Sequence, residues 1–209
     1  MAGINPDPFS RFAEFVAETK SKHIGHDTAE NRRPYVPLSA LHEYWTPSRI
    51  SSVLRAFPDR LDIDIGVIKR SYLRLFSTLV YTHHDTVPSL AGLFISRNLT
   101  DEKLPWRSRP SEWPDEKFFR DFFDRIAKHQ WQFFPLDFHA DQLHDRHIDE
   151  QCILPIDFVK EIAHGSTASV RAFDIHPEFN HLAPKVCFPH SPSFSIPHSS
   201  VPRHMDVNG

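Results

Sequence analysis

Residues 65–80 read IGVIKRSYLRLFSTLV, and they carry the strongest helical pattern in the chain. Ile65, Ile68, Tyr72, Phe76 and Leu79 follow one another at intervals of three or four residues. This spacing places their side chains on one face of an α-helix. We therefore predict a long helix through 65–80, whose apolar face must be buried against other elements.

Helical signals also lie on both sides of this stretch. Asp7 and Pro8 form a typical helix start, because a carboxylate caps the first turn and proline is favoured at the first helical position. Thr46 and Pro47 give the same signal for another helix, and Gly25 is expected to end the first one. Further segments with helical spacing are 38–44, 88–94 and 115–130, whereas 27–37 and 99–114 read as loops. The pattern predicts five or six helices and no strand before residue 135, packed as a small α bundle.

The pattern changes after residue 150. Residues 158–162 and 169–175 are strand-like, and a turn signal lies between them at 164–167. The tail 184–209 contains five prolines with many Ser and His, and we expect it to be disordered. The predicted fold is mainly α: a helical domain over 1–150, a short β-hairpin region over 151–183 and the tail 184–209.

Composition excludes several classes of protein. The formal net charge of the 209 residues is −3, and Lys and Arg form no basic stripe, so we predict no nucleic-acid binding. Six Gly against 18 Pro argue against a Gly-rich barrel or a βαβ nucleotide fold. The sequence has no long apolar stretch and no leader peptide, which indicates no membrane partner. We expect a cytoplasmic or nuclear protein in which Cys152 and Cys187 are reduced.

One segment suggests a nucleotide loop. Residues 161–172 read EIAHGSTASVRA. A protein kinase places a Gly-rich loop between its first two strands, where bare backbone approaches the ATP phosphates and a following Val covers the adenine. On that template Gly165 matches the middle glycine and Val170 the valine, while Ala163 and Ala168 occupy the outer glycine positions and add methyl groups there. An ordinary β-hairpin is the alternative interpretation.

Other segments carry a family resemblance together with this hairpin. They are 72–81 (YLRLFSTLVY), 130–136 (QWQFFPL), 143–147 (LHDRH), 153–156 (ILPI) and 174–177 (DIHP). Over residues 40 to 183 the chain resembles the N-terminal region of uncharacterised fungal serine/threonine protein-kinase-like proteins. The resemblance implies a helical leader followed by the start of a kinase N-lobe. It also implies that ATP, with Mg²⁺, would contact the residues Ile162, Gly165, Ser166, Thr167, Val170 and Lys185.

The sequence departs from an active kinase in several ways. Lys185 is the only lysine after Lys160, and it follows Pro184, which cannot donate to a sheet ladder. The His-Arg-Asp, Asp-Phe-Gly and Ala-Pro-Glu motifs are absent, so neither a proton acceptor nor a Mg²⁺ clamp is present. We assign no catalytic residue and expect no phosphoryl transfer by this chain alone. The change of composition after Leu182 suggests a truncated gene product.

Two functional classes remain open. The favoured one is a non-catalytic interaction or regulatory module of a protein-kinase-like protein, with an unidentified protein partner. The alternative is an ATP-binding fragment of a serine/threonine kinase or pseudokinase whose catalytic lobe is missing from this chain.

Three further constellations have a functional and a structural interpretation. A metal site could be formed by His139, Asp141, His144, Asp145 and His147, although this spacing is equally that of a polar connecting segment, and we assign no metal ligand. His83, His84 and Asp85 suggest an oriented base, but histidine is also favoured at a helix C-terminus. An aromatic stripe is expected to be mostly core, with the remainder free for a partner, and it comprises Phe118, Phe119, Phe122, Phe123, Trp131, Phe133 and Phe134.

Overall fold

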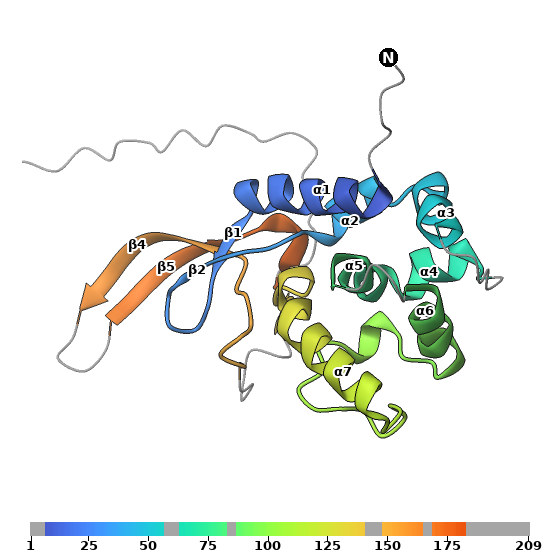
Figure 1. Cartoon of the computed structure of the whole chain (residues 1–209). Helices are drawn as coiled ribbons and strands as arrows, with labels where there is room; N and C mark the ends of the chain where they lie inside the picture. Colours follow the sequence, from blue (N-terminus) through green and yellow to red (C-terminus); the bar gives the residue numbers. More distant parts are fainter. Residues whose placement is uncertain (1–6, 57–62, 83–86, 141–147, 165–168, 183–209) are drawn as a thin grey trace, which may run out of the picture.

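The computed structural model describes residues 7–56, 63–82, 87–140, 148–164 and 169–182. Within these ranges the chain is mainly α, as the sequence predicts (Figure 1). The helices are α1 (Pro8–Lys22), α2 (Leu38–Tyr44), α3 (Pro47–Arg55), α4 (Ile65–Ser71), α5 (Leu73–Thr82), α6 (Val87–Ser96) and α7 (Lys117–His129). The strands are β1 (Ile24–His26), β2 (Arg32–Pro34), β3 (Phe138–His139), β4 (Ile156–His164), β5 (Ser169–Ile175) and β6 (Asn180–His181). The predicted disordered tail, 184–209, lies outside the described residues.

The helix starts predicted from Asp7 and Thr46 are confirmed. The Asp7 carboxylate accepts a hydrogen bond from the backbone N–H of Ser10, at 3.2 Å, and Pro8 occupies the first position of α1. The hydroxyl of Thr46 accepts from the N–H of Arg49 in the same way at the start of α3. Each side chain accepts a hydrogen bond from a backbone N–H of the first turn that has no acceptor within the helix.

The predictions for the segment after α1 are wrong. α1 ends at Lys22, and Gly25 lies in β1, which pairs antiparallel with β2 inside the predicted loop 27–37. A Cβ on Gly25 would lie 2.3 Å from the backbone oxygen of Leu154, so glycine is needed for close approach of two backbones. Two hydrogen bonds join the same segments, between His26 and Leu154, at 2.9 and 2.7 Å. Strands of three residues are too short to show an alternating pattern.

The predicted long helix through 65–80 is two helices. The backbone leaves helical geometry at Tyr72, with φ −136° and ψ 16°, and α5 begins at Leu73. The carboxylate of Asp101 accepts hydrogen bonds from the N–H groups of Arg74 and Leu75, both at 2.9 Å. A residue distant in sequence thus caps a new helix start, which helical spacing alone does not reveal.

The larger core surrounds α5. This helix packs against α1, α2, α4, α6 and α7 (Figure 1). Trp45 is buried there with its ring 4.7 Å from that of Phe12 and 5.0 Å from that of Phe76, between ring centroids. Its indole Nε1–H donates to the hydroxyl of Ser77 at 2.9 Å. The apolar face predicted for 65–80 is therefore buried, as expected.

A smaller core joins the helices to the C-terminal strands. Its buried residues come from both sides of residue 150: Tyr35, Trp131, Leu136, Phe138, Cys152, Ile153, Ile156 and Phe179. The short parallel pair β3 and β6 closes this core, and the N–H of Leu136 donates to the carbonyl of Ile153 at 2.8 Å. The base of the C-terminal hairpin is therefore packed on the helical part of the chain.

The predicted C-terminal strands are confirmed as the antiparallel pair β4 and β5, with Phe158 opposite Phe173. In Figure 1 this hairpin extends beyond β1 and β2, away from α3, α4 and α6. Register shifts lie between Phe158 and Lys160 and between Glu161 and Ala163. Such bulges increase the twist of a strand pair. Of the predicted turn 164–167, residues 165–167 lie outside the described residues.

Candidate functional site

The residues predicted to contact ATP are only partly described. Ile162 lies on β4 at the second register shift, and 62% of its surface is exposed. The backbone of Val170 lies on β5 opposite Ala163. The other four predicted contacts, Gly165, Ser166, Thr167 and Lys185, lie outside the described residues. The structure therefore brings Ile162 and Val170 to the same hairpin, and the nucleotide site stays a prediction.

The hairpin carries most of the large hydrophobic side chains that are exposed in the described part of the chain. Among the described residues, the large hydrophobic side chains that are exposed are Phe158 at 39%, Phe173 at 44%, Ile162 at 62% and Phe118 at 51%. Three of these four belong to β4 and β5, and we call Phe158, Ile162 and Phe173 the hairpin surface. The ring of Phe158 lies 4.8 Å from that of His26, and the ring of Phe173 lies 6.4 Å from that of Phe138.

The base of the hairpin is acidic. Asp157 and Asp174 are exposed and stand directly opposite each other on β4 and β5, beside a hollow of about 520 Å³. Burial, together with the negative charge of Asp157, raises the pKa of the Tyr35 hydroxyl in this hollow to about 12. Lys22 also borders it, but its ammonium pairs with Glu18 at 2.6 Å. Like charges directly opposite each other destabilise a strand pair, so a cationic group would be favoured here.

The other predicted constellations have different outcomes. Of the possible metal ligands, only His139 is described, and its ring stacks on that of His181 with 4.5 Å between centroids. No group of three His, Cys, Asp or Glu side chains within the described ranges is placed to hold a metal ion. His83, His84 and Asp85 lie outside the described residues. The prediction that the aromatic stripe is mostly core is confirmed, because Phe122, Phe123, Trp131, Phe133 and Phe134 are buried and Phe118 is exposed.

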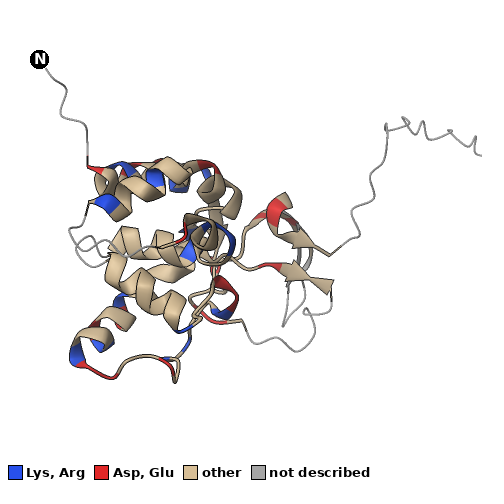
Figure 2. Cartoon of the chain, turned by 90° about the vertical axis from the view of Figure 1, so that its right-hand side faces the viewer, with Lys and Arg blue, Asp and Glu red and all other residues tan. Residues whose placement is uncertain are grey.

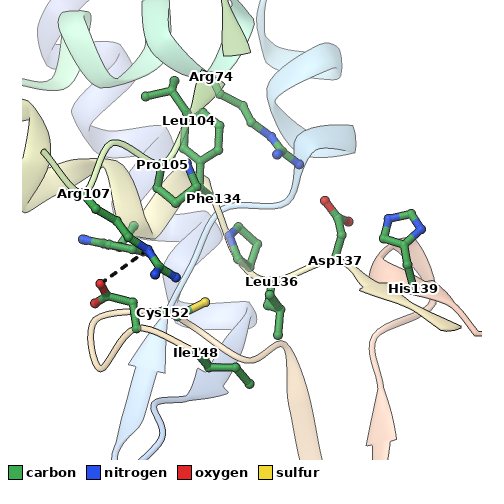
Figure 3. Close-up of a pocket in the computed structure, with 13 residues that line it drawn as sticks. Arg74, Leu104, Pro105, Arg107, Phe134, Leu136, Asp137, His139, Ile148 and Cys152 are labelled. Atoms are coloured by element: carbon green, nitrogen blue, oxygen red, sulfur yellow. Dashed lines mark ion pairs between the residues drawn. The ribbon is translucent and has the colours of Figure 1, made fainter. Parts of the chain in front are cut away.

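Sequence reasoning missed a cavity of about 310 Å³, shown in Figure 3. It lies where the start of α5, the loop before α7 and the segments around β3 and Cys152 meet. Its apolar lining includes Leu104, Pro105, Phe134, Leu136 and Ile148, and its polar lining consists of Arg74, Arg107, Asp137, His139 and Asp149. These residues are spread from 74 to 152, so no local motif could identify them. A cavity that combines apolar and charged side chains can hold a ligand that carries both kinds of group.

The charged groups of this cavity are unequally paired. Arg107 forms an ion pair with Asp149, at 3.8 Å, and Asp137 contacts His181 at 3.4 Å. The guanidinium of Arg74 lies over the ring of Phe134, 5.0 Å from its centroid, and in Figure 3 it points toward Asp137. Its Nε is buried and has no hydrogen-bond partner within the described part of the chain.

Asp101 caps the start of α5 and accepts a hydrogen bond from the backbone of Arg74, which lines the cavity. Burial raises the pKa of its carboxyl to about 6, and the opposing hydrogen bonds from the Arg74 and Leu75 N–H groups only partly offset that effect. The positive charge of Arg74 acts in the same direction as those hydrogen bonds. We therefore expect the stability of this helix start to depend on pH between about 4 and 6.

No family model, curated protein or solved structure matches the chain. The resemblance to protein-kinase-like proteins accordingly stays a prediction. Within the described ranges there is no helix with the length and apolar character needed to cross a membrane. Lys and Arg lie on several separate elements of the described chain in Figure 2. The two features that stand out are thus the hairpin surface and the cavity beside Arg74.

Proposed function

We propose that the chain is a non-catalytic interaction or regulatory module, belonging to a protein-kinase-like protein, and that it binds a protein partner through the hairpin surface. The observation that carries this proposal is the concentration of exposed Phe158, Ile162 and Phe173 on one hairpin. Exposed apolar groups gathered in one place are typical of interaction sites. The kinase-like origin rests on the sequence resemblance alone.

The shape of the hairpin supports this use. A two-stranded sheet is marginally stable by itself, and β4 and β5 form such a sheet among the described strands. Among the described side chains of the hairpin, those at its base pack into the smaller core, such as Ile156. A partner that covers the hairpin surface would bury apolar area that the helices leave exposed. Asp157 and Asp174 at the base favour a partner with a basic group next to its apolar contact.

A double substitution tests the proposal. We expect Phe158→Ser with Phe173→Ser to weaken partner binding at least 30-fold, because truncated aromatic anchors typically cost 2 kcal/mol or more. The partner is first isolated by photocrosslinking in a lysate of the source cells, with p-benzoylphenylalanine in place of Ile162. Its dissociation constant is then measured with the purified proteins.

Phe118 provides the matched control, because its ring is about equally exposed but lies on α7. A crosslinker in place of Phe118 should not capture the same protein, and Phe118→Ser should leave the dissociation constant unchanged. Equal binding by the double variant and wild type would refute the proposal, provided that circular dichroism shows both to be folded.

The nucleotide-binding alternative has one observation in its favour. β4 and β5 are antiparallel strands that flank residues 165–168, which is the arrangement expected for a kinase Gly-rich loop. Titration calorimetry of residues 1–209 with ATP, with and without Mg²⁺, tests it. Micromolar binding that Gly165→Val abolishes would support a pseudokinase-like function, and the absence of heat up to millimolar ATP would exclude it.

A further inference from the structure

We propose that the cavity beside Arg74 binds a small monocarboxylate with an apolar body. The site is separate from the hairpin surface and does not depend on the proposed interaction function. Three properties of the cavity carry the inference: an arginine without a close ion pair among the described residues, the unsatisfied donor of that arginine, and the size and walls of the cavity.

Arg74 is the arginine of the described lining that forms no close ion pair. Arg107 is paired with Asp149, and Asp137 is in contact with His181. Arg74 forms no close ion pair within the described part of the chain. The carboxylate of Asp101, on which its charge also acts, accepts hydrogen bonds from backbone N–H groups of α5. The planar fork of a guanidinium matches a carboxylate, which can accept two parallel hydrogen bonds from it.

The Arg74 side chain is already positioned for such a ligand. Its guanidinium rests on the ring of Phe134, which limits its freedom, and its buried Nε–H has no acceptor among the residues that the structure describes. A buried donor without a partner is unfavourable, because it loses the hydrogen bond that it makes to water in the unfolded chain. A ligand carboxylate in the cavity would supply the missing acceptor.

The dimensions and walls restrict the rest of the ligand. A volume of about 310 Å³ is at the lower end of the range for small-molecule sites. Leu104, Pro105 and Ile148 line the cavity together with Phe134 and Leu136, so the body of the ligand can make apolar contacts, while charged side chains line the rest. A nucleotide is disfavoured, because its phosphates carry several negative charges and the lining already holds the carboxylates of Asp137 and Asp149.

The test uses 4-phenylbutyrate and its uncharged amide, 4-phenylbutyramide, as probes of equal shape. Titration calorimetry with the wild-type chain should show binding of the carboxylate and at least tenfold weaker binding of the amide. Arg74→Met should abolish this preference, and Arg74→Lys should restore part of it. Arg49→Met is the matched control, because Arg49 also lies over an aromatic ring, 4.3 Å from the centroid of Tyr44, but outside the cavity.

Equal affinity for acid and amide, no binding of the acid up to millimolar concentration, or a preference that survives in Arg74→Met would each overturn the proposal. If Arg74→Met does not fold, the wild-type comparison of acid with amide still decides. Location is checked with Cys152, which lines the cavity, in a chain carrying Cys187→Ser. The acid should slow modification of Cys152 by a thiol reagent, and an unchanged rate would place the ligand elsewhere.

Discussion

Replacing Trp45 with alanine is expected to lower the free energy of unfolding by about 4 kcal/mol, since removing a buried tryptophan leaves a cavity that the core fills only partly. Trp45 is almost completely buried and packs between Phe12 of α1 and Phe76 of α5. The substitution also leaves the hydroxyl of Ser77 without the donor that it accepts from. The loss is a large part of the total stability of an ordinary domain.

Urea unfolding followed by circular dichroism measures this change. Trp45→Phe serves as a graded variant, because it keeps most of the apolar contacts and removes the indole N–H. We expect it to lower the free energy of unfolding by about 1–2 kcal/mol. Phe118→Ala serves as the surface control and should change stability by less than about 0.5 kcal/mol. A Trp45→Ala chain within 1 kcal/mol of the wild type would show that α1, α2 and α5 do not share the core described.

Asp101→Asn is expected to change how stability depends on pH. The pKa of the Asp101 carboxyl is about 6 in the folded chain, against the usual 3.8 that applies when the chain is unfolded. The folded chain therefore binds this proton more tightly, and the contribution of Asp101 to stability falls as pH rises from about 4 to about 6. This difference in pKa between the folded and the unfolded chain corresponds to roughly 3 kcal/mol in the free energy of unfolding.

Asparagine keeps the shape of the side chain but has no charge to bury. Asp101→Asn loses one of the two hydrogen bonds to the start of α5, because its amide nitrogen cannot accept. As pH rises from 4 to 7, the free energy of unfolding of the variant should nevertheless increase by about 2–3 kcal/mol relative to that of wild type. Urea unfolding of both chains across this range measures the difference.

The adjacent exposed carboxylate provides the control for this experiment. Glu102 lies in the same 3₁₀ turn, Asp101–Lys103, and its carboxylate is exposed, so Glu102→Gln removes a charge that is not buried. Its stability difference from wild type should therefore stay nearly constant with pH, whereas that of Asp101→Asn should not. A difference between Asp101→Asn and wild type that does not vary between pH 4 and pH 7 would contradict the burial of a charged Asp101 at neutral pH.

Local sequence patterns predict most of the helical part of this protein. The starts at Asp7 and Thr46, the short helix 38–44 and the apolar face of 65–80 are all present, because capping and helical spacing act within a few residues. The strands β4 and β5 are predicted for a similar reason, since they are long enough to show a pattern. The sequence shows Phe158, Ile162 and Phe173 on the predicted strands, but it does not show that their side chains are exposed.

Several other features depend on contacts between residues that are distant in sequence. The helix break at Tyr72 depends on Asp101, and the strand β1 depends on the backbone of Leu154, which Gly25 allows to approach. The cavity beside Arg74 is likewise assembled from segments that only folding brings together.

The amino-acid sequence by itself therefore determined the class of fold, the placement of most helices and the long C-terminal strands, because these follow from interactions between near neighbours in the chain. The tertiary structure alone decided where α5 begins, which apolar residues stay exposed on the hairpin, and that the buried Nε of Arg74 has no hydrogen-bond partner among the described residues. The physical reason is that burial and the pairing of charges depend on all the segments that meet at a point, and a linear sequence does not specify their distances.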